Sequence, residues 1–373
     1  MIKKLFFIAG FLLLGLILWS QSKSHNPDIF DDQPREAKGV RIVFYNVENL
    51  FDIYNDSLKR DEDFTPEGKN HWDNYKYYKK QNNIAKVLMN VGGWEAPAII
   101  GLCEIENRFV LNHLVYKTSL KKFNYKIVHF ESPDRRGIDN GLLYRPEKFK
   151  PIYSKAIGID CPFDKNLRTR DILYVKGLVL NHDTIHIFVN HWPSRWGGQA
   201  ASEPKRMFVA KVQKEVVDSI LKVNPEANIM IMGDLNDEPQ DKSLIESLEA
   251  KSPIDFNHQI TSGSCNIYQN IKPSLLYNLM SEKKYRHQGS LVYKDKIGYN
   301  WNMFDQIIVS GALLAGNKKL NIKNNKAEIF KSSYLLEEKE NGILVPFRTF
   351  SGPRYLGGFS DHLPVYIDIF LSK

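Results

Sequence analysis

Short apolar runs rich in β-branched and aromatic residues recur along the chain, and each run ends in polar residues. Such runs predict β-strands, and near-continuous apolar runs such as IHIFV and NIMIM predict strands that are buried on both faces. Some neighbouring runs are separated by only a few residues, as at Asn181–Asp183, and this spacing predicts hairpins. The predicted strands are Val40–Tyr45, Ala98–Leu102, Tyr125–Phe130, Gly141–Tyr144, Ile172–Leu180, Thr184–Val189, Asn228–Met232, Phe304–Val309 and Pro364–Phe370.

Between some of these strands, apolar residues recur at the three- and four-residue spacing of one helix face. The clearest case is Tyr75–Val91, whose apolar face is formed by Ile84, Val87, Leu88 and Val91. The other predicted helices are Asn107–Leu120, Glu203–Leu221 and the shorter Asp241–Leu248.

The mixture of buried strands and amphipathic helices predicts sheets packed on each other with helices outside. Two long polar stretches, Asp52–Asn74 and Asn257–Asn300, are predicted to be loops or insertions. Since no linker divides the chain after residue 40, we expect one large domain over residues 41–373.

The first 22 residues have the pattern of an export signal. Lys3 and Lys4 precede the uncharged run Leu5–Trp19, which as a helix spans about 22 Å and is shorter than the roughly 30 Å hydrocarbon core. Ser20 and Ser22 then offer small residues for cleavage. We therefore expect a periplasmic or secreted protein without stable membrane association, preceded by a linker over residues 23–40. The alternative is an uncleaved membrane anchor over residues 5–19.

The overall composition is that of a globular protein, with 43% hydrophobic and 25% charged residues, and this excludes a disordered chain or a multi-span membrane protein. The net charge of +8 mildly favours polyanionic partners, and no protein partner is evident. The three cysteines, Cys103, Cys161 and Cys265, have neither a disulfide-framework nor a zinc-site spacing. A disulfide between Cys103 and Cys161 stays an alternative to free thiols.

Polar residues that can carry chemistry cluster where the predicted strands end. Strand ends on one side of a sheet converge in space, and a rigid scaffold there can hold a site. Carboxylate and amide oxygens without a Cys or His cluster suit a hard cation, and two histidines beside carboxylates suit acid–base chemistry. The pattern therefore predicts metal-assisted hydrolysis of a phosphate ester. The residues are Asn46, Glu48, Glu104, His191, Asp234, Asn236, Asp305, Asp361 and His362.

Each of these residues also has a simpler interpretation. A single Asn or Asp after a strand is usually a turn residue, and His191 could be a histidine of the core. Asp305 is harder to explain in this way because it interrupts an apolar run, and a buried carboxylate needs a partner, which His362 could be. Turns alone do not readily account for the whole set.

Seven motifs, in order, resemble those of the endonuclease/exonuclease/phosphatase superfamily, which includes pancreatic-type deoxyribonuclease and the apurinic endonucleases. They are FYNVENLFD, GLCEIEN, RRGIDNGLLYR, VNHWPSRWGG, IMGDLNDEP, MFDQIIVS and GGFSDHLPV, and they extend over residues 41–370. The NHWPSRWGG form with FTPEG near residue 64 is most similar to a secreted bacterial nuclease-like branch. The resemblance implies an α/β four-layer sandwich, in which two packed mixed β-sheets are flanked by helices, as in deoxyribonuclease.

The resemblance also implies roles for individual residues. Glu104 corresponds to the central ligand of a Mg²⁺ ion, with Mn²⁺ or Ca²⁺ as alternatives, and Asn46, Glu48 and Asp361 correspond to positions near that metal. Asp234 corresponds to the residue that positions or deprotonates the attacking water, and Asn236 to a transition-state stabiliser. The catalytic histidine is His362, oriented by Asp305, and His191 is the second histidine. Whether Asp234 or His362 is the base stays open.

Two arginines, Arg136 and Arg195, are candidates for binding substrate phosphates, with a solvated surface role as the alternative for each. The leading functional hypothesis is an exported metal-dependent endonuclease that hydrolyses DNA or RNA. The alternative is a phosphatase or phosphodiesterase that acts on a small phosphorylated or lipid-derived substrate. A binding protein on an inactive scaffold is disfavoured by the complete set of site residues.

Overall fold

The computed structural model describes residues 39–253, 271–281, 288–294, 298–315, 319–339 and 342–371. The predicted export signal, nearly all of the predicted linker and Cys265 lie outside these residues. Within them, no helix has both the length and the apolar character needed to cross a bilayer.

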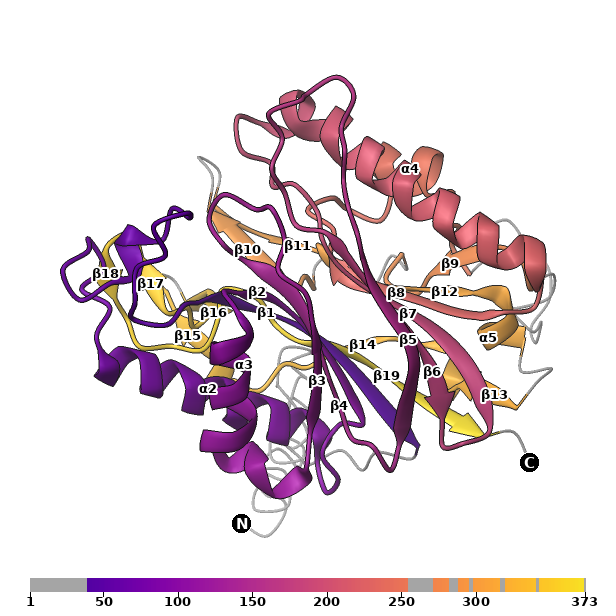
Figure 1. The fold of residues 1–373 in the computed structure, drawn as a ribbon, viewed down its shortest axis with the longest axis horizontal. Coiled ribbons are helices and arrows are strands. Elements are labelled where there is room, and N and C mark those ends of the chain that lie inside the picture. The colour runs from indigo at the N-terminus through magenta and orange to yellow at the C-terminus, as the bar shows by residue number, and fades with distance from the viewer. Residues whose placement is uncertain are drawn as a thin grey trace, which may run out of the picture. The chain divides into compact units, whose positions relative to one another are not determined.

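The first sheet has a parallel pair of strands, β1 (Val40–Leu50) and β2 (Ile99–Ile105), at its centre. Its strand order is β13-β19-β1-β2-β4-β3, and β14 also pairs with β19. The helices α2 (Asn74–Gly92) and α3 (Arg108–Lys117) lie on its outer side (Figure 1). The remaining strands are β3 (Lys126–His129), β4 (Asp139–Tyr144), β13 (Leu320–Ile322), β14 (Glu328–Ile329) and β19 (Val365–Leu371).

The second sheet also has one parallel pair, β7 (Asp183–His191) and β8 (Asn228–Asp234). The helix α4 (Gln199–Val223) connects this pair and lies over the outer face of the sheet (Figure 1). The strand order is β5-β6-β7-β8-β12-β9. The other strands are β5 (Phe149–Ile157), β6 (Ile172–Val179), β9 (Leu276–Asn278) and β12 (Asp305–Ser310).

Short elements decorate the two sheets. The hairpins are β10–β11 (Leu291–Lys294 and Tyr299–Asn302), β15–β16 (Leu336–Glu338 and Leu344–Pro346) and β17–β18 (Phe350–Ser351 and Arg354–Tyr355). The short helical segments are α5 (Gly311–Ala315), the 3₁₀ turns Glu62–Phe64, Ser119–Phe123, Lys323–Asn325 and Ser333–Leu335, and the π-type turn Ser243–Ser247.

The core lies between the two sheets, because alternate residues of each strand face inward. Ile42 of β1 and Val189 of β7 share this inner cluster. Gly101 also faces inward: a Cβ there would lie 2.6 Å from the Cε of Met232, so glycine allows the sheets to approach closely. Residues with the opposite orientation, such as Ile231, pack against α4 in a separate cluster. The fold is therefore the predicted α/β four-layer sandwich.

Most of the predicted elements are present, with a few differences. The predicted helix over 107–120 ends at Lys117, and a 3₁₀ turn follows. The stretch Asn257–Asn300, predicted to be a loop or an insertion, contains β9, β10 and the start of β11 among its described residues, so the loop alternative is wrong there. The sequence does not predict β5, because only its two end residues, Phe149 and Ile157, are buried and it has no apolar run. Cys103 and Cys161 are both free thiols, so the disulfide considered between them is not formed.

Candidate active site

The structure brings polar side chains together where the parallel strands of both sheets end. Asn46 and Glu104 lie near the carboxyl ends of β1 and β2, whereas His191 and Asp234 are the last residues of β7 and β8. Gly233 of β8 allows β8 to lie close to the end of β7, since a Cβ at Gly233 would lie 2.5 Å from the backbone oxygen of Asn190. The two βαβ units therefore present their polar ends to one common edge.

The amide of Asn46 is the central contact of this edge. Its Nδ2 donates to Asp234 Oδ2 at 3.0 Å and lies 3.5 Å from Glu104 Oε1. The same nitrogen lies 3.4 Å from His362 Nε2. Asn46 is completely buried, and its Oδ1 accepts from the backbone amide of Glu48 at 2.9 Å. One side chain thus links the first sheet, the second sheet and the segment before β19.

His362 and Asp305 form a buried pair, with Nδ1 and Oδ2 separated by 2.6 Å. Burial opposes the charged form of His362, but Asp305 and Asp234 outweigh it and raise the pKa of the imidazole well above its usual value. Asp234 Oδ2 lies 3.7 Å from His362 Nε2. Burial, opposed by His362 and reinforced by Asp305, raises the pKa of Asp234 to about 7. Near neutral pH, His362 therefore carries the proton and Asp234 is close to its titration midpoint.

His191 has the opposite electrostatics. Its Nε2 lies 3.7 Å from Asp234 Oδ2 and 3.8 Å from Glu104 Oε1. Burial, together with the charges of Arg170 and Arg136, lowers its pKa well below the usual value, so the ring is neutral. Its Nδ1 is buried and has no hydrogen-bond partner among the described residues. The site therefore contains one charged and one neutral histidine.

Glu104 is set at an irregularity where β1 and β2 lose register beyond Asn46 and Cys103. The backbone of Glu104 is left-handed, with φ of 59°, and its Oε2 accepts from the amide of Asn49 at 2.9 Å. Within the described chain, Glu104 has no ion pair with a lysine or arginine, so its charge is available to a cation. The Glu104 oxygens are donors that a hard divalent ion prefers, whereas the Asn46 amide turns its nitrogen toward Glu104 and its oxygen toward the Glu48 amide. The Glu104 carboxylate therefore fits the predicted metal, and the metal role of Asn46 stays a prediction.

Asp234, Asp305 and His362 also form a group whose ligand atoms lie within 4.8 Å of one another. A second such group, His129, Glu131 and Asp139, lies on β3, β4 and the loop between them, at the same end of the first sheet, since Asp139 pairs with Ile105 next to Glu104.

Glu48 and Asp361, both predicted to lie near the metal, contact Arg348. Asp361 Oδ2 accepts from Arg348 Nη2 at 3.0 Å, and Glu48 Oε1 lies 3.4 Å from Arg348 Nε. Glu48 Oε2 also accepts from the amide of Thr349 at 2.6 Å and lies 4.0 Å from Lys80 Nζ. Burial and the charge of Asp361 raise the pKa of Glu48 to about 7. These contacts favour a structural role for Glu48, and the metal role of both residues stays a prediction.

Asn236 sits in the loop that follows β8, with a left-handed φ of 51°. The backbone nitrogen of Asn236 donates to Asp234 Oδ1 at 3.0 Å, and its side-chain Nδ2 donates to the backbone oxygen of Trp192 at 3.0 Å. The loops after β7 and β8 are thus tied together through Asn236. Its predicted role as a transition-state stabiliser stays a prediction, in a position next to Asp234.

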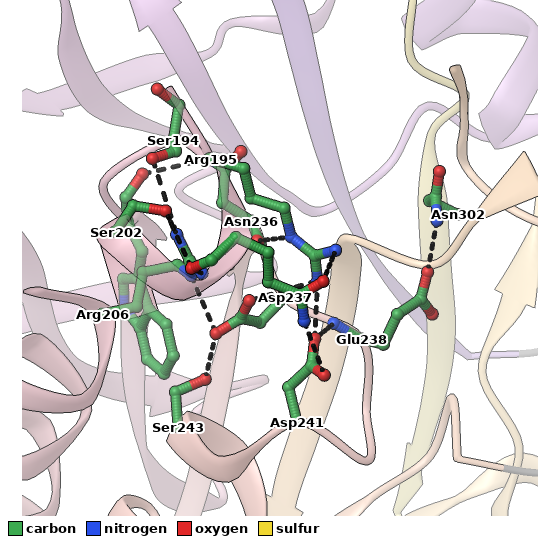
Figure 2. Close-up of polar contacts among 12 residues, drawn as sticks. Ser194, Arg195, Ser202, Arg206, Asn236, Asp237, Glu238, Asp241, Ser243 and Asn302 are labelled. Carbon is green, nitrogen blue, oxygen red and sulfur yellow. Dashed lines mark hydrogen bonds and ion pairs between the residues drawn. The ribbon is translucent and has the colours of Figure 1, made fainter. Parts of the chain in front are cut away.

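The two candidate phosphate ligands differ sharply. Arg195 is engaged within the protein: it contacts Asp237 and Asp241 at 3.1 and 2.6 Å and donates to the backbone oxygen of Asn236 at 2.9 Å (Figure 2). Its guanidinium also lies over the ring of Phe304. These contacts favour a supporting role rather than the predicted phosphate contact. Arg136, in contrast, is exposed and close enough to lower the pKa of His191.

Sequence reasoning missed two buried cations that reach this edge from helices. Lys80 of α2 is 1% exposed and Arg206 of α4 is fully buried. Both occupy the apolar face of their helix, since Lys80 is four residues before Ile84 and Arg206 is four before Ala210. A charged residue on an apolar face is the signal that could have identified them.

Comparisons with known proteins agree with this fold. The family model described as "Endonuclease/Exonuclease/phosphatase family" matches residues 41–371. Similar solved structures include TDP2 from Caenorhabditis elegans, with a TM-score of 0.52 and 15% identity over 97% of this chain and 85% of that one. TDP2 from D. rerio, complexed with a single-strand DNA product, has a TM-score of 0.51 and 13% identity over 89% and 99% of the two chains.

The catalytic domain of human Nocturnin with bound sulfate has a TM-score of 0.50 and 15% identity, over 91% of this chain and 96% of that one. At these identities the likeness concerns the fold. No curated protein sequence matches the chain.

Proposed function

Because the chain belongs to the endonuclease/exonuclease/phosphatase family of metal-dependent phosphoric ester hydrolases, we propose that it is an exported divalent-metal-dependent endonuclease that hydrolyses DNA or RNA. One observation carries the catalytic part of this proposal. The amide of Asn46 joins Asp234, Glu104 and His362 at a single edge formed by both sheets. An acid–base pair, a metal-binding carboxylate and hydrogen-bond donors are thereby available to one phosphate group.

In the proposed reaction, Asp234 orients the attacking water and accepts its proton. This assignment is supported by the raised pKa of Asp234, about 7, and by the raised pKa of His362, which keeps the imidazole protonated at neutral pH and therefore unable to accept the proton of the water. Asp305 orients the His362 ring and supports its positive charge, as a carboxylate does in hydrolase triads. The His362 cation and Asn236 meet the negative charge that develops as the bond from phosphorus to the leaving oxygen breaks, and the His362 cation supplies the proton that this oxygen takes up.

Mg²⁺ is the proposed ion, with Mn²⁺ and Ca²⁺ as alternatives, and the Glu104 carboxylate is the group that would hold it. When bound, the ion supplies Lewis-acid polarisation of the phosphate ester.

The substrate is the less constrained part of the proposal. The net charge of +8 and the exposed Arg136 beside the site favour a polyanion. D. rerio TDP2, whose fold is similar, is complexed with a single-strand DNA product, and this supports a nucleic acid as the proposed substrate. A phosphatase or phosphodiesterase acting on a small or lipid-derived substrate is the alternative. Export is supported by the pattern of residues 1–22.

Cleavage of supercoiled plasmid by the chain from residue 23, with Mg²⁺ present, tests the proposal. We expect nicking that EDTA abolishes and that an Asp234→Asn, His362→Ala double variant lacks. A matched double variant at exposed positions, Asp218→Asn with His182→Ala, should nick like the wild type. No nicking of plasmid or RNA by folded, metal-loaded protein that still hydrolyses bis(4-nitrophenyl) phosphate would favour the alternative substrate class. Hydrolysis of none of them would overturn the proposal.

A further inference from the structure

Behind the catalytic loop of residues 234–237 lies a buried network of charges. Asp237 and Arg206 are both fully buried, and Arg206 Nε lies 2.8 Å from Asp237 Oδ2. Arg195 reaches the other oxygen of the same carboxylate at 3.1 Å. Ser243 Oγ also donates to Asp237 Oδ2, at 2.6 Å. Figure 2 shows these side chains converging on Asp237.

The network ties together three separate segments. Arg206 extends from α4, and its Nη1 donates to Ser202 Oγ at 2.7 Å in the first turns of the same helix. Arg195 belongs to the loop that follows His191, and it also pairs with Asp241 at 2.6 Å. Two cations thus face two carboxylates, so the buried charges are balanced.

The contacts bear directly on the geometry of the catalytic loop. Arg195 Nε donates to the backbone oxygen of Asn236 at 2.9 Å, and Gln306 Nε2 donates to that of Asp237 at 2.6 Å. Asn236 is held in a left-handed conformation, which turns its side chain toward Trp192 while that of Asp237 turns to Arg206. Asp234 lies two residues earlier and accepts from the Asn236 amide. Any shift of Asp237 is therefore transmitted to both residues.

We propose that Arg206 and Asp237 are positioning residues, which fix the loop 234–237 against α4 and thereby hold Asp234 and Asn236 in place relative to His191. The inference rests on the proposed phosphodiester hydrolysis for its kinetic consequence. A displacement of about 1 Å at reacting groups can lower a rate about 10²-fold, so the network affects turnover rather than substrate binding.

Steady-state hydrolysis of bis(4-nitrophenyl) phosphate with Mg²⁺ tests the proposal. We expect Arg206→Met to lower kcat about 10²-fold with KM within about threefold, and Arg206→Lys to retain part of kcat. Lys214→Met is the matched control, since Lys214 lies on the same helix and pairs with Asp218 at the surface. It should leave kcat and KM unchanged.

The double variant Arg206→Met, Asp237→Asn separates positioning from stability. Neutralising both partners leaves no uncompensated buried charge, so the melting temperature should return toward that of the wild type. The value of kcat should remain low, because the tie to α4 is still missing. Recovery of both quantities would overturn the proposal, as would a folded Arg206→Met variant with kcat within threefold of the wild type. If Arg206→Met does not fold, the double variant and Arg206→Lys decide.

A readout independent of turnover distinguishes failure of this inference from failure of the proposed function. The side-chain amide resonance of Asn236 should shift in Arg206→Met and stay unchanged in Lys214→Met, as followed by ¹H–¹⁵N NMR. An unmoved resonance would contradict the positioning role. If the resonance shifts in Arg206→Met as expected but the wild type hydrolyses no diester, only the proposed function is contradicted.

Discussion

The two βαβ units, β1-α2-β2 and β7-α4-β8, have the same arrangement at the shared edge but differ in the buried cation that supports it. In each, two parallel strands deliver polar residues to the shared edge, and the connecting helix sends one buried cation toward it. Arg206 of α4 contacts its carboxylate, Asp237, at 2.8 Å. Lys80 of α2 lies 4.0 Å from Glu48 and instead donates to Thr349 Oγ1 at 2.5 Å and to the backbone oxygen of Phe359 at 2.7 Å.

The difference shows how pairing distance governs a buried charge. Burial lowers the pKa of Lys80 to about 8 and raises that of Glu48 to about 7, because their mutual attraction does not offset desolvation. Guanidinium groups resist such neutralisation, since they stay protonated in proteins and can contact a carboxylate with several donors. Burial also raises the pKa of Asp237, so the difference lies in the cation: Arg206 keeps its charge, whereas the pKa of Lys80 is lowered toward neutral pH.

The largest effects should come from removing one reactive residue from each unit. We expect Glu104→Gln, in the first unit, and Asp234→Asn, in the second, each to lower kcat on plasmid DNA about 10²–10⁴-fold. Glu104→Gln should also raise the Mg²⁺ concentration needed for half-maximal rate, because a carboxylate is lost from the proposed metal position. Metal titration of the initial rates measures both quantities, with Asp218→Asn as the control. A Glu104→Gln variant that stays active and needs the same Mg²⁺ concentration for half-maximal rate would contradict the role assigned to the first unit.

The next effect concerns stability and contrasts the two buried cations directly. Arg206→Met should lower the free energy of unfolding by about 3 kcal/mol, because it removes the closest and only fully buried cation of the Asp237 carboxylate and leaves the more distant Arg195 as its ion-pair partner. Lys80→Met should cost only about 1–3 kcal/mol, since Glu48 can take up a proton when the ammonium is removed. Urea unfolding of both variants and of Lys214→Met at one pH checks the order. A greater loss for Lys80→Met than for Arg206→Met would contradict the role given to pairing distance.

The two arginines first considered for substrate binding should separate by substrate size. Arg136→Met should raise KM for a polynucleotide a few-fold and make binding less salt-dependent, because one phosphate contact is lost. It should leave a small diester unaffected. Arg195→Met should lower kcat on both substrates, because it supports the Asn236 backbone. Kinetics at two salt concentrations provide the measurement. If Arg195→Met changes only the KM of the polynucleotide, its predicted phosphate contact regains support.

The smallest expected effect tests whether a shifted pKa far from the shared edge also contributes to stability. His186 lies near the other end of β7, where burial and then Lys176 lower its pKa from 6.5 to about 4. The unfolded chain therefore takes up a proton first as pH falls, and stability should decrease between about pH 6.5 and pH 4. His186→Gln should flatten this decrease in melting temperature, whereas His182→Gln at the exposed hairpin should not. Equal pH profiles for His186→Gln and the wild type would show that this histidine does not contribute.

The sandwich was predictable because its central strands carry their own signal. Runs such as Asn228–Met232 are apolar on both faces, as strands between a core and a helix layer must be. β5 lacks that signal, since it lies at the sheet edge with Ile152 and Tyr153 exposed. The loop Asn257–Asn300 was misread for a related reason, because its strands are only three or four residues long.

For the site, sequence motifs located the chain positions but not the partners of each side chain. The sequence predicts the pairing of Asp305 with His362, because a carboxylate inside an apolar run needs a partner. The structure places His362 Nδ1 2.6 Å from Asp305 Oδ2. The contacts of Arg195 with Asp237 and Asp241 depend on how α4 and the loop after β8 pack. Local patterns contain no information on such packing. The export signal of residues 1–22 and the ion that binds remain predictions.

The antiparallel pairing of β1 with β19 has a consequence for the order of events during synthesis. Asn46 and His362 are 316 residues apart in the chain, yet only 3.4 Å separates their side chains. A growing chain that has not yet reached residue 362 therefore lacks the proposed catalytic histidine and leaves one edge of β1 unpaired. We expect the proposed hydrolytic activity to appear only once this late segment has joined β1.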